Sequence, residues 1–366
     1  MKVEIDLGAI RRNLRRIAAK TSKPLALMVK ADGYGHGALQ VARAVEANWY
    51  GVATEEEGIP LRELEKQVLV TAPSCFGAPL LARYDMIPLI GEWELAKAAI
   101  ACGVKRCHLA VNSGMNRLGF TGEKECYEAA ALLTEGGVRV EGIATHYKGS
   151  DGEILRAQNE AFDRAVIAAR KGAADKGAQG RTFTHVTGSG ALYASGYDVL
   201  RVGLAAYGYH GEYTAGIPLE KAMRVTSRVI KKKRIVRGDT LGYAGAFRAT
   251  RSLYAYTVLG GYGDGVARVD AGRKVIAAGR RLKVAAVSMD SFEMISDRVD
   301  LPVGTRVIIL SDAVDAEMVA AHRGTIPYEV LLGFNVPRAE KVYVDERTGE
   351  KDGQGAFVRF DPRGKG

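Results

Sequence analysis

Residues 25–38 read LALMVKADGYGHGA, and the rest of the chain can be understood outward from this segment. An apolar run typical of a buried strand leads one lysine, Lys30, into a glycine-rich turn. Burying a lysine costs free energy unless something uses its amine. A partly desolvated lysine loses its proton more readily, which suits Schiff-base chemistry. The alternative is a surface lysine just past the end of a strand.

The segment is the first of eight strand-like runs that alternate with Ala-, Glu- and Leu-rich stretches of helical spacing. A short strand over 2–7 and a helix over 8–20 precede it, and the stretch 191–197 is too short for a full helix. Eight strands in about 200 residues predict a (β/α)8 barrel of the TIM type. The eight expected strands cover 25–31, 49–54, 67–73, 86–90, 106–112, 138–146, 181–188 and 198–204.

The sequence changes character near residue 215. Runs of Val, Ile, Tyr and Arg then alternate with glycine turns as far as about residue 345, which predicts a mainly β second domain without helices. A chain of 366 residues also exceeds what one core normally serves. We therefore expect an α/β barrel domain over 1–215 and a β domain over 216–366, with residues 1–8 available as a strand for the second domain.

Composition predicts a cytoplasmic protein. The chain is 47% hydrophobic and 26% charged, and it contains no apolar run of the roughly 18 residues that a spanning helix needs. The N-terminal residues lack the apolar core of a signal peptide. The four cysteines (Cys75, Cys102, Cys107 and Cys126) match no zinc spacing, so we expect reduced thiols and no metal site.

The formal net charge of +10 raises the question of nucleic acid. The densest basic run, RVIKKKRIVR at 228–237, has few aromatic residues and matches no nucleic-acid motif. A solvated strand or loop face explains it better, so we expect neither nucleic acid nor a membrane as partner. The positive potential would help to attract a phosphate cofactor and a carboxylate substrate.

Five residues able to do chemistry fall where the predicted barrel strands end, which is where barrel enzymes place their active sites. They are Lys30, Arg117, His146, Ser189 and Arg201. The other histidines have simpler explanations. His36 fits a hydrogen bond within its own loop, and His185 fits a structural position on a strand.

Ten segments carry a resemblance to a known family, in the family's order. They are EIDLGAIRRN, VKADGYGHG, GVATEEE, SGMNRLGF, GIATHY, VRVGLAAYG, LGYAGAFRAT, LGGYGDGVAR, SMDSFEMI and TIPYEVL. Together they resemble the alanine racemases, which are amino-acid racemases of fold type III that depend on pyridoxal 5′-phosphate (PLP). The resemblance implies a homodimer that interconverts L-alanine and D-alanine, the latter serving the bacterial cell wall.

The resemblance also implies roles for the two bases. Lys30 would hold the cofactor covalently and act as one base, and Tyr262 would reach the site from the partner subunit as the other. Racemisation needs acid/base groups on opposite faces of a planar intermediate, because one removes the α-proton and the other returns a proton from the far side.

The remaining site residues are implied in the same way. Arg201 would donate to the pyridine nitrogen, and His146 would lie beside the reacting groups. Arg117 and Met289 would bind the substrate. The phosphate would be held by the residues Tyr34, Ser189, Gly203 and Leu204.

The sequence departs from the family pattern in ways that concern the substrate. Ala110 stands where many members have a carbamylated lysine that fixes the Arg117 equivalent, so Asn112 or a bound anion would have to replace it. Ala286 and Phe334 stand where an arginine and a phosphate-binding tyrosine are common. A racemase for serine or other small amino acids is therefore an alternative, and a non-catalytic PLP carrier is another. A related decarboxylase would need a cysteine in the second domain, and no cysteine follows Cys126.

Overall fold

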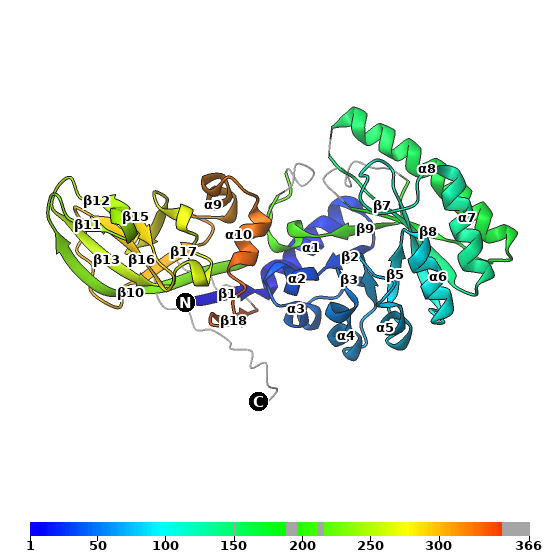
Figure 1. Ribbon diagram of the computed structural model, residues 1–366, viewed down its shortest axis with the longest axis horizontal. Helices are drawn as coiled ribbons and strands as arrows, with labels where there is room; N and C mark the ends of the chain where they lie inside the picture. The colour runs from blue at the N-terminus through cyan, green and yellow to red at the C-terminus, as the bar shows by residue number, and fades with distance from the viewer. Residues whose placement is uncertain (150, 188–195, 211–215, 346–366) are drawn as a thin grey trace.

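The structure is a computed structural model that describes residues 1–149, 151–187, 196–210 and 216–345. The molecule is elongated, with a helix-covered barrel at one end and a β-sheet domain at the other (Figure 1). Within the described residues, no helix is both long enough and apolar enough to cross a membrane. All four cysteines are free thiols.

Eight parallel strands close into the predicted barrel, with β9 pairing back onto β2. All eight expected strands are confirmed, although each is shorter than expected, and the first ends two residues before Lys30. The strands are β2 (Leu25–Met28), β3 (Trp49–Val52), β4 (Val68–Val70), β5 (Ile87–Ile90), β6 (Arg106–Val111), β7 (Arg139–His146), β8 (Phe183–Thr187) and β9 (Val199–Val202).

Helices cover the outside of the barrel and bury one face each against the strands. They are α1 (Leu7–Thr21), α3 (Ala38–Ala44), α4 (Glu55–Glu63), α5 (Ala78–Arg83), α6 (Trp93–Ala101), α7 (Gly122–Glu135) and α8 (Gly152–Asp175). A short helix, α2 (Lys30–Tyr34), follows β2, and the 3-10 turn η1 (Leu204–Tyr207) follows β9. The expected 191–197 segment lies largely outside the described residues.

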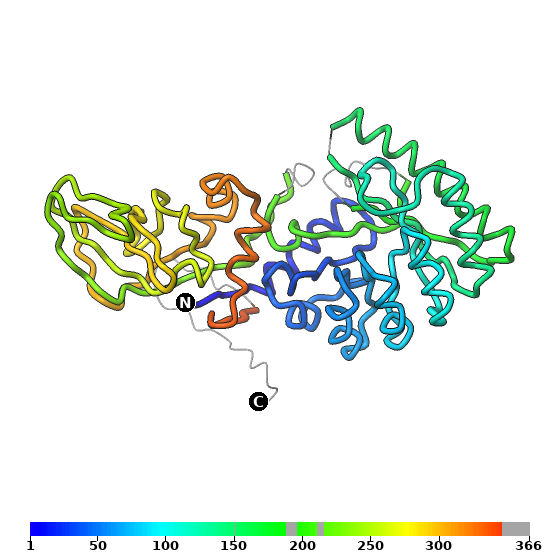
Figure 2. Tube along the Cα trace, viewed as in Figure 1, coloured from blue at the N-terminus to red at the C-terminus, as the bar shows by residue number. Residues whose placement is uncertain are grey.

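The chain begins in the second domain. Strand β1 (Lys2–Asp6) pairs with β10 (Met223–Ile235) and with β18 (Glu340–Val344), and Figure 2 shows it beside β10 and apart from the barrel. The domain's main sheet runs in the order β13-β16-β15-β14-β17-β10-β1-β18, with β13 also pairing with β10. The remaining strands are β11 (Thr240–Leu241), β12 (Phe247–Arg248), β13 (Leu253–Leu259), β14 (Lys274–Ala277), β15 (Arg280–Val287), β16 (Ser291–Ser296) and β17 (Arg306–Leu310).

The second domain is mainly β, as expected, but it also contains two short helices, which a domain of strands alone would not have. Helices α9 (Ala316–Arg323) and α10 (Pro327–Gly333) lie between the sheet and the barrel (Figure 1). Each is only eight or seven residues long, which is too short for its periodicity to stand out in the sequence. The 3-10 turns of this domain are η3 (Tyr243–Gly245), η4 (Tyr262–Asp264) and η5 (Arg268–Asp270).

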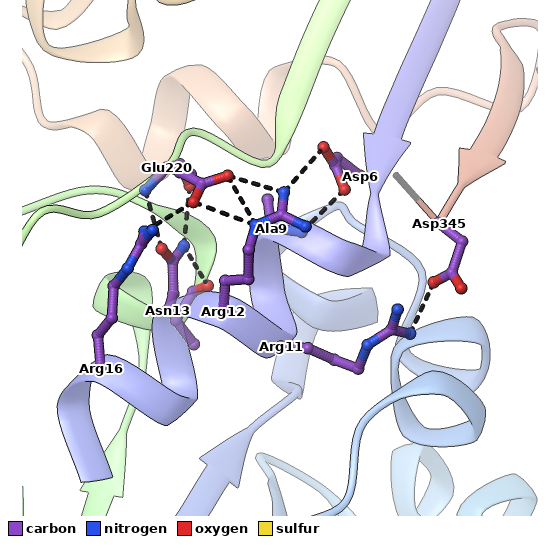
Figure 3. Close-up of polar contacts among 9 residues, drawn as sticks. Asp6, Ala9, Arg11, Arg12, Asn13, Arg16, Glu220 and Asp345 are labelled. Carbon is purple, nitrogen blue, oxygen red and sulfur yellow. Dashed lines mark hydrogen bonds and ion pairs between the residues drawn. The ribbon is translucent and has the colours of Figure 1, made fainter. Parts of the chain in front are cut away.

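A polar network fixes the junction of the two domains (Figure 3). Asp6 ends β1 and caps α1 by accepting from the Ala9 amide at 2.8 Å. Arg12 on α1 donates from Nε and Nη2 to the carboxylate of Glu220, which precedes β10, and Arg16 pairs with the same carboxylate at 2.7 Å. The hydrogen bond from Arg12 is the largest cause of the lowered pKa of Glu220. One continuous apolar core runs through both domains.

Candidate active site

Lys30 begins an unusual turn at the barrel rim. Ala31, Asp32 and Tyr34 all have φ between +52° and +54°, and Gly33 between them has φ of +65°. A left-handed conformation costs about 1–2 kcal/mol for each residue with a Cβ. A run of this kind persists only where the surroundings enforce it.

Two carboxylates enforce the turn. Glu57 on α4 accepts from the Ala31 amide and from the Ala53 amide, each at 2.8 Å. Asp32 accepts from the Ala38 amide at 2.9 Å and pairs with Lys341 of the second domain at 2.8 Å. The backbone that directly follows Lys30 is therefore held by groups from two other parts of the chain. Glu57 lies in the quoted segment GVATEEE, but nothing in the sequence distinguishes it from its two glutamate neighbours.

Positive charge surrounds the Lys30 amine. Burial lowers the pKa of Lys30, and Arg117 and then Arg201 lower it further, while Glu57 opposes them. Burial likewise lowers the pKa of His146 to about 3, helped by the same two arginines. A lysine with a lowered pKa and a neutral imidazole therefore lie beside two arginines.

Arg201 is the most deeply placed of these cations. It lies on β9 with 5% of its surface exposed, and its Nη2 donates to the Thr145 carbonyl at 2.6 Å. Among the residues that the structure describes, none is a hydrogen-bond partner of its buried Nε. Burial, assisted by Arg117, lowers its pKa to about 10. A buried donor without an acceptor costs free energy, so an acceptor supplied by a bound molecule would stabilise this position.

Asn112 organises the loop that carries Arg117. Its side-chain oxygen accepts from the amides of Gly114 and Asn116, and its side-chain nitrogen donates to Asn116 Oδ1 and Thr121 Oγ1. Arg117 Nη2 lies 3.4 Å from His146 Nδ1. Because arginine only donates, Nδ1 accepts there, and the proton of the neutral ring is on Nε2. Asn112 thus holds the loop at a point where Ala110 contributes no polar group.

Hydrogen bonds between buried polar groups hold the end of β7 against α8. Gln158 on α8 donates to Ser113 Oγ at 3.2 Å and to the His146 carbonyl at 3.4 Å. Ser113 Oγ in turn lies 2.7 Å from Thr145 Oγ1. The strand end that carries His146 and contacts Arg201 is therefore tied to both α8 and the Arg117 loop.

Three aromatic rings gather beside the predicted phosphate site. The Tyr34 ring lies 5.3 Å from Tyr207 and 5.7 Å from Tyr328 of α10, measured between ring centroids. A Cβ on Gly203 would lie 2.9 Å from the Tyr34 hydroxyl oxygen, so glycine there lets the hydroxyl approach the backbone that begins η1. Leu204 follows directly and is buried. Ser189 lies outside the described residues.

Nothing in the sequence singles out Tyr328 as a neighbour of Tyr34. Phe334, which stands where a phosphate-binding tyrosine is common in the family, is fully buried in the core. The tyrosine that reaches Tyr34 comes instead from the quoted segment TIPYEVL. Ala286 is also buried, on β15 beneath the turn at Gly242.

The other barrel histidines are structural. His36 lies within its own loop as expected, with Nδ1 3.0 Å from the Gly33 carbonyl, and burial lowers its pKa to about 4. His108 and His185 are buried on neighbouring sides of the barrel interior, with ring centroids 4.7 Å apart. Burial lowers the pKa of both, that of His108 to about 3.

Tyr262 and Met289 form a separate group in the second domain. The Tyr262 amide donates to the Ser288 carbonyl at 3.0 Å, and the Gly263 amide donates to the Met289 carbonyl at 3.0 Å. Their side chains are exposed, at 42% for Tyr262 and 53% for Met289. In the described part of the chain, no hydrogen bond joins either side chain to the barrel rim.

The rim residues fit PLP, which has an anionic phosphate and a ring nitrogen that can accept a hydrogen bond. The buried Nε of Arg201, which has no partner within the described residues, offers the matching donor. The close approach at Gly203 leaves a small cradle beside the Tyr34 hydroxyl. Burial and the neighbouring arginines lower the pKa of Lys30, which increases the share of the neutral amine that reacts with a carbonyl. The residues present therefore suit the ring nitrogen, the phosphate and the carbonyl group of PLP.

Comparison with known proteins shows which family the chain resembles. The model of the alanine racemase N-terminal domain matches residues 5–211, and that of the C-terminal domain matches residues 222–343. The chain is 32% identical to an alanine racemase of Streptococcus pneumoniae (strain Taiwan19F-14), over 92% of this chain and 97% of the relative.

Solved structures agree with this. Alanine racemase from D-cycloserine producing Streptomyces lavendulae is 27% identical with a TM-score of 0.85, covering 94% of this chain and 97% of that one. The fold also matches alanine racemase from Bartonella henselae with covalently bound pyridoxal phosphate, at 23% identity and a TM-score of 0.84, covering 94% and 99% of the two chains. The chain belongs to the alanine racemase family.

Proposed function

We propose that the protein is a PLP-dependent racemase that interconverts L-alanine and D-alanine in an active site shared by two copies of the chain. The observation that carries this proposal is Lys30 itself, a half-buried lysine at the barrel rim whose pKa is lowered by burial and by the neighbouring cations Arg117 and Arg201. When bound, PLP supplies a carbonyl carbon that binds amino groups covalently and a conjugated ring that withdraws electrons from Cα.

Lys30 acts in two ways in this account. Its neutral amine binds the cofactor, and afterwards it exchanges a proton with Cα from one face. Tyr262 of the partner subunit exchanges a proton from the opposite face, with Met289 of the partner subunit beside it. The exposure of Tyr262 and the lack of a described bond to its own barrel support a role in a neighbouring site.

The remaining rim residues bind and orient. Arg201 donates from Nε to the ring nitrogen and, because it keeps its own proton, holds that nitrogen as an acceptor. Tyr34, Ser189 and the amides of Gly203 and Leu204 hold the phosphate. Arg117 binds the substrate carboxylate, and His146 beside it stays neutral.

Membership of the family supports a proposal for the biological setting. We place the domain boundary between residues 215 and 216 and the enzyme in the cytoplasm as a homodimer, with D-alanine supplied to the cell wall. The partners are a second copy of this chain and a small amino acid.

A panel of L-amino acids tests the proposal. PLP-loaded protein is incubated with alanine, serine and larger amino acids, and the products are resolved by chiral chromatography beside the Tyr262→Phe variant. We expect alanine to racemise fastest and Tyr262→Phe to lose about 10²–10⁴-fold in rate. Faster turnover of serine would instead identify a serine or broad-specificity racemase. No turnover of any substrate by PLP-loaded protein would identify a carrier.

A further inference from the structure

The two turns that carry Tyr262 and Met289 are joined by backbone hydrogen bonds. The hydrogen bonds from the amides of Tyr262 and Gly263 to residues 288 and 289 join them. With its side chain 42% exposed, Tyr262 has little packing of its own, so its position depends on how the turn beneath it is held.

Asp264 closes that turn from inside. Its Oδ2 accepts from the Gly261 amide at 3.0 Å, and only 6% of the residue is exposed. Arg338, in the segment between α10 and β18, binds both carboxylate oxygens, Nε to Oδ1 at 2.6 Å and Nη2 to Oδ2 at 2.8 Å. A bidentate pair of this kind fixes direction as well as distance.

The same guanidinium also holds the second turn. Arg338 Nη1 donates to Asp290 Oδ1 at 2.7 Å, and Nη2 lies 3.3 Å from the Met289 carbonyl. A Cβ on Gly263 would lie 2.4 Å from Nη2, so the guanidinium lies flush against the backbone next to Tyr262. One side chain therefore bridges the two turns that carry the second-domain site residues.

We propose that Arg338 is a positioning residue that aims Tyr262 into the site of the partner subunit, acting through Asp264 and Asp290. This inference rests on the proposed function, because it assumes that Tyr262 is the second base. A lysine would keep the charge but could not bind Asp264 in bidentate fashion while reaching Asp290.

A matched control lies in the same domain. Arg251 pairs with Asp297 at 2.5 Å, at the ends of β13 and β16 opposite to the Tyr262 turn. Its side chain is exposed, as half of Arg338 is. Arg251→Ala therefore removes an arginine–aspartate pair from this sheet without touching either turn.

The test follows the release of deuterium from Cα-deuterated L-alanine and D-alanine in ordinary water, for each enantiomer separately. The step breaks the Cα–deuterium bond, passes the deuteron to one base and then to solvent, and returns a proton. Tyr262→Phe defines which enantiomer depends on Tyr262. We expect Arg338→Ala to slow release from that enantiomer at least about tenfold and from the other less than about twofold, with Arg338→Lys between. Arg251→Ala should change neither.

Backbone amide exchange gives a readout independent of activity. In Arg338→Ala, peptides covering 260–266 and 288–291 should lose protection, while those of β10 keep it. Equal slowing of both enantiomers, or unchanged protection of both turns, would overturn the positioning role. If the wild-type protein released deuterium from neither enantiomer, the proposed function would fail, while amide exchange would still report whether Arg338 holds the turns.

Discussion

At the barrel rim, Lys30, Arg117 and Arg201 lie within range of one another's charge, and Glu57 is the carboxylate that opposes their effect on Lys30. In the second domain, by contrast, Arg338 binds Asp264, and Arg323 binds Asp270 through both carboxylate oxygens at 2.7 Å. The first arrangement leaves positive charge available to an anion. The second uses positive charge to hold backbone in place.

This difference separates residues that meet a ligand from residues that position others. Burying cations beside one another is costly, and the lowered pKa values of Lys30 and Arg201 reflect that cost. A bound phosphate and a substrate carboxylate would offset it. The paired arginines of the second domain need no ligand, because their charges are already neutralised within the chain.

The largest effect is expected from removing the amine of Lys30. Lys30→Ala should abolish covalent attachment of PLP and lower the racemisation rate by more than about 10⁴-fold, since the residue both binds the cofactor and moves a proton. Borohydride reduction followed by peptide mass spectrometry reports the attachment. Lys97→Ala, an exposed lysine on α6, is the control and should change neither quantity. Attachment at another lysine would contradict the assignment.

A smaller effect tests the charge of the rim itself. Arg117 is the charged neighbour that lowers the pKa of Lys30 most. Arg117→Gln should therefore raise that pKa, and the pH profile of PLP capture should move to higher pH because the neutral amine reacts. Capture at neutral pH should slow about two- to tenfold. Arg117→Lys keeps the charge, so an equal shift in that variant would show that charge is not the cause.

The smallest effect concerns the stability of the fold at low pH. We expect the barrel to open before the second domain as the pH falls. His108 has a pKa of about 3 when folded, against about 6.5 when exposed. Above pH 6.5 the residue is neutral in both states and has no effect. As the pH falls below 6.5 the unfolded chain binds the proton first, so the folded state loses about 2 kcal/mol by pH 5.

His108→Leu removes this dependence at one position. Urea unfolding at pH 7 and pH 5 should show a smaller loss of the free energy of unfolding in the variant than in the wild type. Amide exchange at pH 5 should show opening in β6 and β8 before the strands of the second domain. Equal losses in the two proteins would mean that His108 is not buried in its neutral form.

The sequence predicted the barrel well because its eight strands are apolar and regularly spaced, and a local pattern suffices to place them. The position of Lys30 after an apolar run left a surface lysine as the alternative, and the resemblance to the alanine racemases is what favoured a catalytic one. The sequence could not reveal the left-handed turn at Ala31 and Asp32, because that turn is imposed by Glu57 and Lys341 from elsewhere in the chain.

In the second domain, too, contacts between distant parts of the chain could not be predicted from the sequence. Tyr328 and Phe334 are both aromatic residues near α10, and only packing decides that the tyrosine reaches Tyr34 while the phenylalanine is buried. Arg338 likewise gives no local signal, because its partners lie 74 and 48 residues away in sequence. Residues that position others are defined by distant contacts, and these are the ones that a sequence pattern misses.

Mixing two inactive variants tests most directly whether the active site is shared between subunits. Lys30→Ala and Tyr262→Phe proteins are unfolded and refolded together in equal amounts, with dimer exchange verified by mass-tagging one variant. Random pairing makes half of the dimers hybrids, and each hybrid has one site with both Lys30 and Tyr262 of the partner subunit, so about one quarter of wild-type activity should return. If verified hybrids show no activity beyond that of the separate variants, Tyr262 does not serve the partner's Lys30, and the account is wrong.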